Sequence, residues 1–348
     1  MNDNYLWDRS GEPDPDIERL EHLLGELRHR PGALDYSRMP APEPAPPRGL
    51  FWRWRSSILA GAACAAVVLV AAGFWWRSPK PVPAAAPSPS PWLVRSLTGT
   101  PNVAGTPLQG ELRVGAEHVI ETDSASTARL SATGVGMIDL GPGTRLRTVT
   151  AGEGEYRLAL ERGTLDAHIW ATPGSFSVET ASATALDLGC SYRLEVTEDG
   201  SGRLHVTLGW VGLGQHEVES LVPAGAVCIL KRGAGPGTPH FADAAGALVE
   251  ALSTIDGSPD RMPAQALETA LAAAGPRDAF TLWHLLRRAA GQDAVRLYER
   301  LAALSPPPAG VTRESVLAKD RTALESWWNT FGLGDAALFG RWRARAAL

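Results

Sequence analysis

Cysteine and histidine are the usual protein ligands of zinc, and cysteine can also serve as a nucleophile. Zinc ligands come in close pairs, yet Cys64, Cys190 and Cys228 lie far apart, and neither His22 nor His29 has a cysteine near it. The sequence also lacks a Gly-x-Ser-x-Gly elbow, a phosphate-binding loop and a His-Glu-x-x-His motif. We therefore expect a protein that is not an enzyme, with no cofactor and no metal site.

Cys190 and Cys228 are the pair for which the sequence suggests covalent chemistry. They are separated by 38 residues within a region of alternating polarity. In an oxidising compartment they could form a disulfide. From the entropy of closing the loop in the unfolded chain, this disulfide would stabilise the folded state by about 4 kcal/mol. Two buried, reduced thiols on separate strands fit the sequence equally well, so both alternatives stay open.

An uncharged run from Ile58 to Trp76 stands out in a chain of 348 residues, 44% of them hydrophobic and 20% charged. As a helix, this run would span roughly 28 Å, which is about the thickness of a membrane's hydrocarbon core. Aromatic residues flank both ends, as they do at membrane interfaces. The run therefore predicts a single transmembrane helix, and the arginines before it favour a cytoplasmic N-terminus. The net charge of −5 argues against direct binding to nucleic acid.

Composition divides the chain around this helix. Proline-rich segments flank it, and beyond them the apolar pattern changes from period two to helical periodicity. The Ala- and Leu-rich last third predicts an all-α bundle or helix-hairpin array of short helices. The predicted parts are a tail (1–37), a linker (38–57), the transmembrane helix (58–76), a spacer (77–92), an all-β domain (93–233), a second linker (234–242) and a helical domain (243–348).

The predicted β domain repeats a short pattern. The segments "DLGPGTRLR" from Asp139 and "DLGCSYRLE" from Asp187 agree at five of nine positions and start 48 residues apart. The segments 156–169 and 202–215 share Arg-Leu-x-φ-x-x-Gly-x-φ, where φ is apolar, 46 residues apart. Two such units can bury their apolar faces against each other, so we expect an internally duplicated β unit. The shared Asp-Leu-Gly is typical of a turn rather than of a catalytic site.

Residues 97–233 resemble the FecR domain in the order of their motifs. The segments that carry the resemblance are "IETDSASTARLSATGVGMIDLGPGTRLRT", "LALERGTLDAHI" and "SFSVETASATALDLGCSYRLEVTEDGSGRLHVTLGWVGL". The resemblance implies a twisted antiparallel β stack in the periplasm, anchored by one inner-membrane helix, and a regulator of an extracytoplasmic-function sigma factor. The chain departs from the family in its helical C-terminal domain, and its tail lacks the His-x-x-x-Cys-x-x-Cys zinc signature of many anti-sigma factors.

The N-terminal tail carries an acidic amphipathic segment. Residues 1–26 have a net charge of −6, whereas residues 27–57 have a net charge of +4. Apolar residues spaced by three and four predict a helix with one apolar face. Because a helix this short is only marginally stable alone in water, its apolar face needs a partner to pack against. Charge complementarity favours a basic, DNA-binding partner, which the resemblance identifies as the sigma factor. The predicted partner-binding residues are Leu6, Trp7, Ile17, Leu20, Leu24 and Leu27. In the alternatives, the helix packs on Leu6 and Trp7 as a small helical hairpin within the tail, or the segment is simply flexible.

Two functions follow from this organisation. The first is a single-pass inner-membrane regulator, anti-sigma-factor-like, that binds a sigma factor in the cytoplasm and senses a periplasmic protein or envelope component. The second is a membrane-anchored periplasmic scaffold or envelope-binding module without sigma-factor regulation. The predicted acidic helix favours the first function, and the departure at the C-terminus favours the second.

Overall fold

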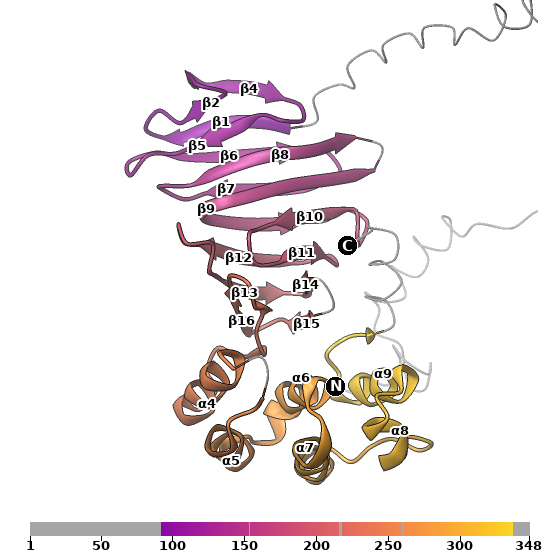
Figure 1. Ribbon diagram of the computed structural model, residues 1–348. Coiled ribbons are helices and arrows are strands. Elements are labelled where there is room, and N and C mark those ends of the chain that lie inside the picture. The colour runs from indigo at the N-terminus through magenta and orange to yellow at the C-terminus, as the bar shows by residue number, and fades with distance from the viewer. Residues whose placement is uncertain (1–91, 153, 216–217, 259–260, 337–348) are drawn as a thin grey trace, which may run out of the picture. The chain divides into compact units, whose positions relative to one another are not determined.

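A computed structural model describes residues 92–152, 154–215, 218–258 and 261–336 (Figure 1). All of them belong to one compact unit, Pro79–Leu348. The predicted tail helix and the predicted transmembrane helix lie outside the described residues. Across the described ranges, no helix is long and apolar enough to cross a membrane. A large β region is followed by a helical region, which confirms this part of the predicted fold class.

One surface of the β region, which we call sheet A, runs the whole length of the stack. Its strands follow one another by pairing, beginning with β4. They are β4 (Glu111–Val114), β1 (Trp92–Thr98), β6 (Thr127–Ala132), β7 (Gly136–Leu140), β9 (Glu155–Ile169), β12 (Ser191–Val196), β13 (Gly202–Leu208) and β16 (Ala226–Lys231), with β17 (Gly235–Pro236) and β18 (His240–Phe241) beside β16.

The second surface, sheet B, faces the first. Its strands, in order of pairing, are β3 (Thr106–Pro107), β2 (Asn102–Val103), β5 (Val119–Glu121), β8 (Arg145–Gly152), β9, β10 (Phe176–Glu179), β11 (Thr184–Asp187), β14 (Trp210–Gln215) and β15 (Val218–Pro223). The pairing of β9 with β10 is parallel, whereas the other pairings in the described sheets are antiparallel.

The long strand β9 belongs to both sheets. Its first half, up to Arg162, pairs in sheet B, and from Gly163 onward it pairs in sheet A. Gly163 has a φ of +99°, which an L-residue rarely adopts, and an added Cβ would lie closer than 3.0 Å to the backbone of Thr144. The strand can therefore turn the corner between the sheets only because this position has no side chain.

The repeated pattern in the sequence corresponds to the same passage of the chain between the sheets, with the two sheets exchanged. The glycine with a positive φ in the turn is Gly143 in the first copy and Gly189 in the second, so the turns differ in detail. After Asp139 the chain passes from β7 in sheet A to β8 in sheet B, and after Asp187 it passes from β11 in sheet B to β12 in sheet A. The glycine that follows turns back in each copy: Gly163 leads into sheet A, and Gly209 leads from β13 into β14 of sheet B. Period-two apolar residues then fill one core between the sheets.

The helical region follows β18 as successive helical hairpins. Its elements are α4 (Gly246–Asp256), α5 (Ala264–Ala273), η2 (Pro276–Asp278), α6 (Ala279–Arg288), α7 (Gly291–Leu304), α8 (Arg313–Leu317), α9 (Arg321–Trp328) and η3 (Asn329–Phe331). Three tryptophans, Trp283, Trp327 and Trp328, are at most 2% exposed, and each indole N–H donates to a backbone carbonyl. Buried indoles with satisfied N–H groups are core residues, so these rings do not form a ligand platform.

Candidate functional site

Helix α6 joins the helical region to the edge of the β stack. His284 Nε2 accepts a hydrogen bond from the backbone N–H of Leu221 in β15 at 3.0 Å, and Thr281 Oγ1 donates to the carbonyl of Pro239 at 2.9 Å. The imidazole donates through Nδ1 to the carbonyl of Phe280 at 2.8 Å, since its Nε2 is the acceptor. Burial, with the positive charge of Arg287, lowers the pKa of His284 well below its usual value, so this contact contains a neutral histidine.

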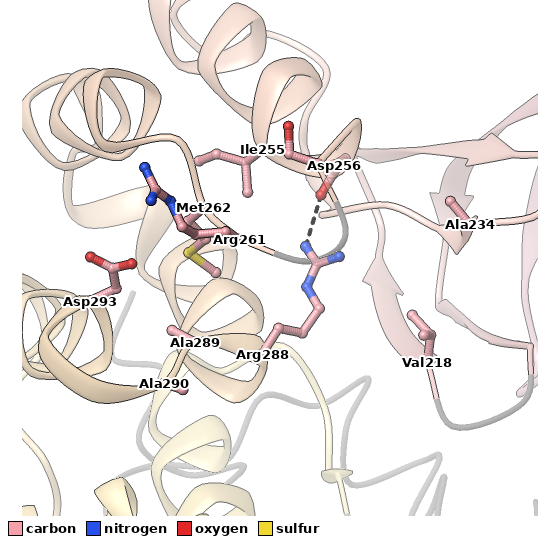
Figure 2. A pocket seen from close by; sticks show the side chains of 11 residues that line it. Val218, Ala234, Ile255, Asp256, Arg261, Met262, Arg288, Ala289, Ala290 and Asp293 are labelled. Carbon is pink, nitrogen blue, oxygen red and sulfur yellow. Dashed lines mark hydrogen bonds and ion pairs between the residues drawn. The ribbon is translucent and has the colours of Figure 1, made fainter.

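A cleft of about 300 Å³ opens beside this junction (Figure 2). It lies between α4, the segment leading into α5, the turn from α6 to α7, strand β15 and the turn that precedes β17. Its apolar wall consists of Val218, Ala234, Ile255, Met262, Ala289 and Ala290. A cleft of this size with an apolar wall and a few charged groups has the composition of a small-molecule site.

An ion pair forms one side of the cleft. Arg288 Nη2 lies 2.9 Å from Asp256 Oδ1, and the same carboxylate accepts from the backbone N–H and the hydroxyl of Thr238, each at 2.7 Å. The side chain of Asp256 is 7% exposed, whereas that of Arg288 is 34% exposed. Asp256 is thus occupied by bonds within the protein, and it holds Arg288 at the cleft in a defined orientation.

The opposite side of the cleft carries Arg261 and Asp293. In Figure 2, Asp293 lies across the cleft from the Arg288 guanidinium, with Ala289 and Ala290 between them. Asp293 belongs to the first turn of α7, whose N-cap residue Ala290 makes no side-chain capping bond. The first N–H groups of a helix have no partner within the helix, so this end of α7 offers additional donors.

The two cysteines of the β region are free and buried, and the candidate disulfide between Cys190 and Cys228 is not formed in the structure. The thiol of Cys190 donates to Asp187 Oδ2 at 2.5 Å, whereas that of Cys228 lies 3.4 Å from the carbonyl oxygen of Gly237. Each thiol is held by its own neighbours on a separate strand or turn. Burial raises the pKa of both thiols, so neither has the character of a reactive thiolate.

Asp187 is the buried member of the repeated pattern. Its side chain accepts from the backbone N–H of Gly189 at 2.7 Å and from the thiol of Cys190, and the residue is 1% exposed. Burial raises its pKa to about 6, although both hydrogen bonds act in the opposite direction. The carboxylate closes the turn between β11 and β12, which is a structural role.

The remaining predicted site residues are not part of this arrangement. The six apolar residues predicted to bind a partner lie outside the described residues, so that prediction stays a prediction. Sequence reasoning identified none of the cleft residues, because they come from five elements that only packing brings together. The only feature of the sequence that could have indicated the cleft is the pair of arginines at the end of α6. Basic residues are common at the C-terminal end of a helix, so this pair did not indicate a binding site. In the described part of the chain, no cluster of side chains has the composition of a metal site.

Comparisons with known proteins do not assign this chain to a family. No family model matches it, and no curated protein matches it. Two crystal structures of a "putative anti-sigma factor" from Parabacteroides distasonis, at 1.65 and 2.50 Å resolution, match with 19% identity and a TM-score of 0.32. Each match covers 39% of this chain and 64% of that protein, so it spans less than two thirds of the protein's length. A match this weak carries no argument about function.

Proposed function

We propose that this chain is a single-pass inner-membrane regulator that binds a sigma factor of the extracytoplasmic-function type through its tail and carries its β and helical regions in the periplasm. It acts by binding, not by catalysis. The order of the parts supports the proposal: an acidic amphipathic segment, an uncharged run of membrane-spanning length, and a β region.

The observation that carries the proposal is the correspondence between the FecR-like motifs and the strands of the stack. The Ala-Arg-Leu motif lies in β6, the Phe-x-Val motif in β10, and the first Asp-Leu-Gly begins at the end of β7. The second Asp-Leu-Gly begins at the end of β11. Motifs that resemble those of the family thus coincide with turns and strands of one two-sheet core, as expected of a domain and not of scattered short matches.

The tail provides the test of this function. The full-length protein in detergent micelles is titrated with each extracytoplasmic-function sigma factor of its cell, and binding is measured by calorimetry. We expect one sigma factor to bind and the variant with Leu20→Asp and Leu24→Asp to lose at least tenfold in affinity, because both charges fall on the predicted apolar face. The control variant, Ala41→Asp with Ala45→Asp, adds the same charge in the linker and should bind normally.

Absence of binding to every sigma factor would contradict the proposal. In that case the membrane-anchored scaffold becomes the better description of the chain. Equal loss in the control variant would leave sigma-factor binding in place but contradict the role of the apolar face, because the effect would then come from net charge.

A further inference from the structure

We propose that the cleft beside α6 binds a small carboxylate ligand of about amino-acid or dipeptide size, with the carboxylate on Arg288. This inference deepens the proposed function by naming a ligand class for the part of the chain placed in the periplasm. Only the biological role of the ligand rests on that function, because the cleft itself is defined by the described residues.

The guanidinium of Arg288 has hydrogen-bond donors at the cleft that a ligand with acceptor atoms could use. Arg288 Nη2 is engaged by Asp256, but among the described residues no partner is found for the other guanidinium donors, Nε and Nη1. A guanidinium has donors and no acceptor, and its charge strengthens each hydrogen bond that it makes. Because Asp256 holds Arg288 in place, a ligand that binds there does not have to order a free side chain.

The acceptors at the same cleft are already engaged or lie at its rim. Asp256 accepts from Thr238 through both of its oxygens in addition to its contact with Arg288. Asp293 is half-buried on the far side, near the uncapped start of α7. Asp293 could attract a cationic ligand, but such a ligand would also meet the positive charges of Arg288 and Arg261, which disfavours it.

The carboxylates of Asp256 and Asp293 favour a carboxylate ligand over a phosphate. Asp256 and Asp293 both line the cleft and would repel a phosphate dianion more strongly than a carboxylate with a single charge. The apolar wall formed by Ile255, Met262 and Ala289 suits a ligand with a short hydrocarbon portion rather than a small inorganic ion. The volume of about 300 Å³ limits this ligand to a small molecule.

Calorimetry on the full-length protein in detergent micelles tests the inference. The probes are the dipeptide L-alanyl-L-leucine, the same dipeptide with an amidated C-terminus, and inorganic phosphate. We expect the dipeptide to bind and the amide to bind at least tenfold more weakly, because the amide offers no carboxylate to the guanidinium and keeps only the positive charge of its amino group. Inorganic phosphate should also bind at least tenfold more weakly than the dipeptide.

Two variants locate the binding. Arg288→Gln should weaken dipeptide binding at least tenfold, but it also breaks the pair with Asp256 and so could disturb the fold. Ala290→Phe leaves that pair intact and fills the cleft from an exposed position with extended backbone, and it should abolish binding. Arg313→Gln removes an exposed arginine that pairs with Glu299 away from the cleft, and it should bind like the unaltered protein.

Four results would overturn the inference: no heat with the dipeptide, equal binding of acid and amide, stronger binding of phosphate, or dipeptide binding that survives Ala290→Phe. The sigma-factor titration on the same preparation keeps the two proposals distinguishable. If that titration succeeds while the dipeptide fails, only the ligand assignment is lost.

Discussion

The two copies of the repeated pattern use different side chains for the same task. In the first copy, the Thr144 hydroxyl donates to the carbonyl of Gly141 at 2.7 Å and accepts from the N–H of Thr164 at 3.0 Å. The position 48 residues later is Tyr192, which cannot make these short-range bonds, and the Asp187 carboxylate holds the turn instead.

The two equivalent aspartates therefore have unlike surroundings. Asp139 is half-buried on the outer side of sheet A and pairs with Arg129 through two bonds, at 2.5 and 2.6 Å. Asp187 points at its own turn and is buried. The comparison teaches that the repeat preserves the path of the chain between the sheets and the corner glycines. The turns themselves differ, since φ is positive at Gly143 in the first copy and at Gly189 in the second, and the polar groups that satisfy them differ as well.

The corner glycines should give the largest effects. Gly163→Ala places a Cβ closer than 3.0 Å to three atoms of Thr144 at a left-handed φ, and we expect it to lower the free energy of unfolding by more than about 4 kcal/mol. In Gly209→Ala, the added Cβ lies closer than 3.0 Å to one atom, the carbonyl oxygen of Gly189. The loss in the free energy of unfolding should therefore be smaller than for Gly163→Ala. Denaturant unfolding followed by circular dichroism measures both.

Gly143→Ala is the control for these corner substitutions. Its φ is +69°, the same as that of Gly209, but nothing lies within 4 Å of an added Cβ. It should cost only about 1 kcal/mol, the intrinsic penalty of the left-handed conformation. If Gly163→Ala costs no more than Gly143→Ala, the corner is not a steric requirement.

The buried aspartate, Asp187, should make the free energy of unfolding depend on pH. The pKa of Asp187 is about 6 in the folded chain, against 3.8 for an unperturbed aspartate, so between these values the folded state binds more protons than the unfolded chain. The Asp187 contribution is therefore present below about pH 4 and is lost as the pH rises through 6, by about 3 kcal/mol at most. Asp187→Asn should remove this loss, as shown by unfolding free energies measured from pH 4 to pH 7.

Asp139→Asn is the matched control for that pH experiment. It breaks the pair with Arg129, in which the side chains are 33% and 38% exposed, and should lower stability by less than about 1 kcal/mol. His284 acts in the opposite direction in every variant, because its lowered pKa gives stability that is lost as the pH falls below about 6.5. The difference between the Asp187 variant and the unaltered protein isolates the carboxylate, and identical pH profiles would refute its assignment.

The smallest effects should come from the equivalent arginines of the two copies. Within the described part of the chain, Arg145 bonds to both Glu121 and Glu161, whereas Arg193 has one ion-pair partner, Asp166. Since all these side chains are at least one third exposed, Arg145→Gln should cost about 1 kcal/mol and Arg193→Gln less than that. The same unfolding assay in low and high salt would reveal a larger salt dependence for Arg145→Gln, and a reversed order would contradict the comparison.

The local patterns predicted a good part of the described fold. Period-two alternation predicted the β region, and helical periodicity predicted the region after it. Both succeed because a strand or helix that buries one face has apolar residues at the period of that element. The repeat predicted a duplicated unit, since the turns and corner glycines depend on local backbone geometry. The exchange of the two sheets between copies was not predicted, because strands in either sheet show the same alternation.

By itself, the sequence determined that a β region is followed by a helical region and that a short pattern recurs within the β region. Tertiary structure alone decided which of two equivalent aspartates is buried and that the two cysteines remain separate. It also decided which side chains of β15, α4, α6, α7 and the turn before β17 meet at one cleft. The physical reason is distance along the chain: turns and amphipathic faces depend on neighbouring residues, whereas burial, pKa and a binding cleft depend on residues that only packing brings together.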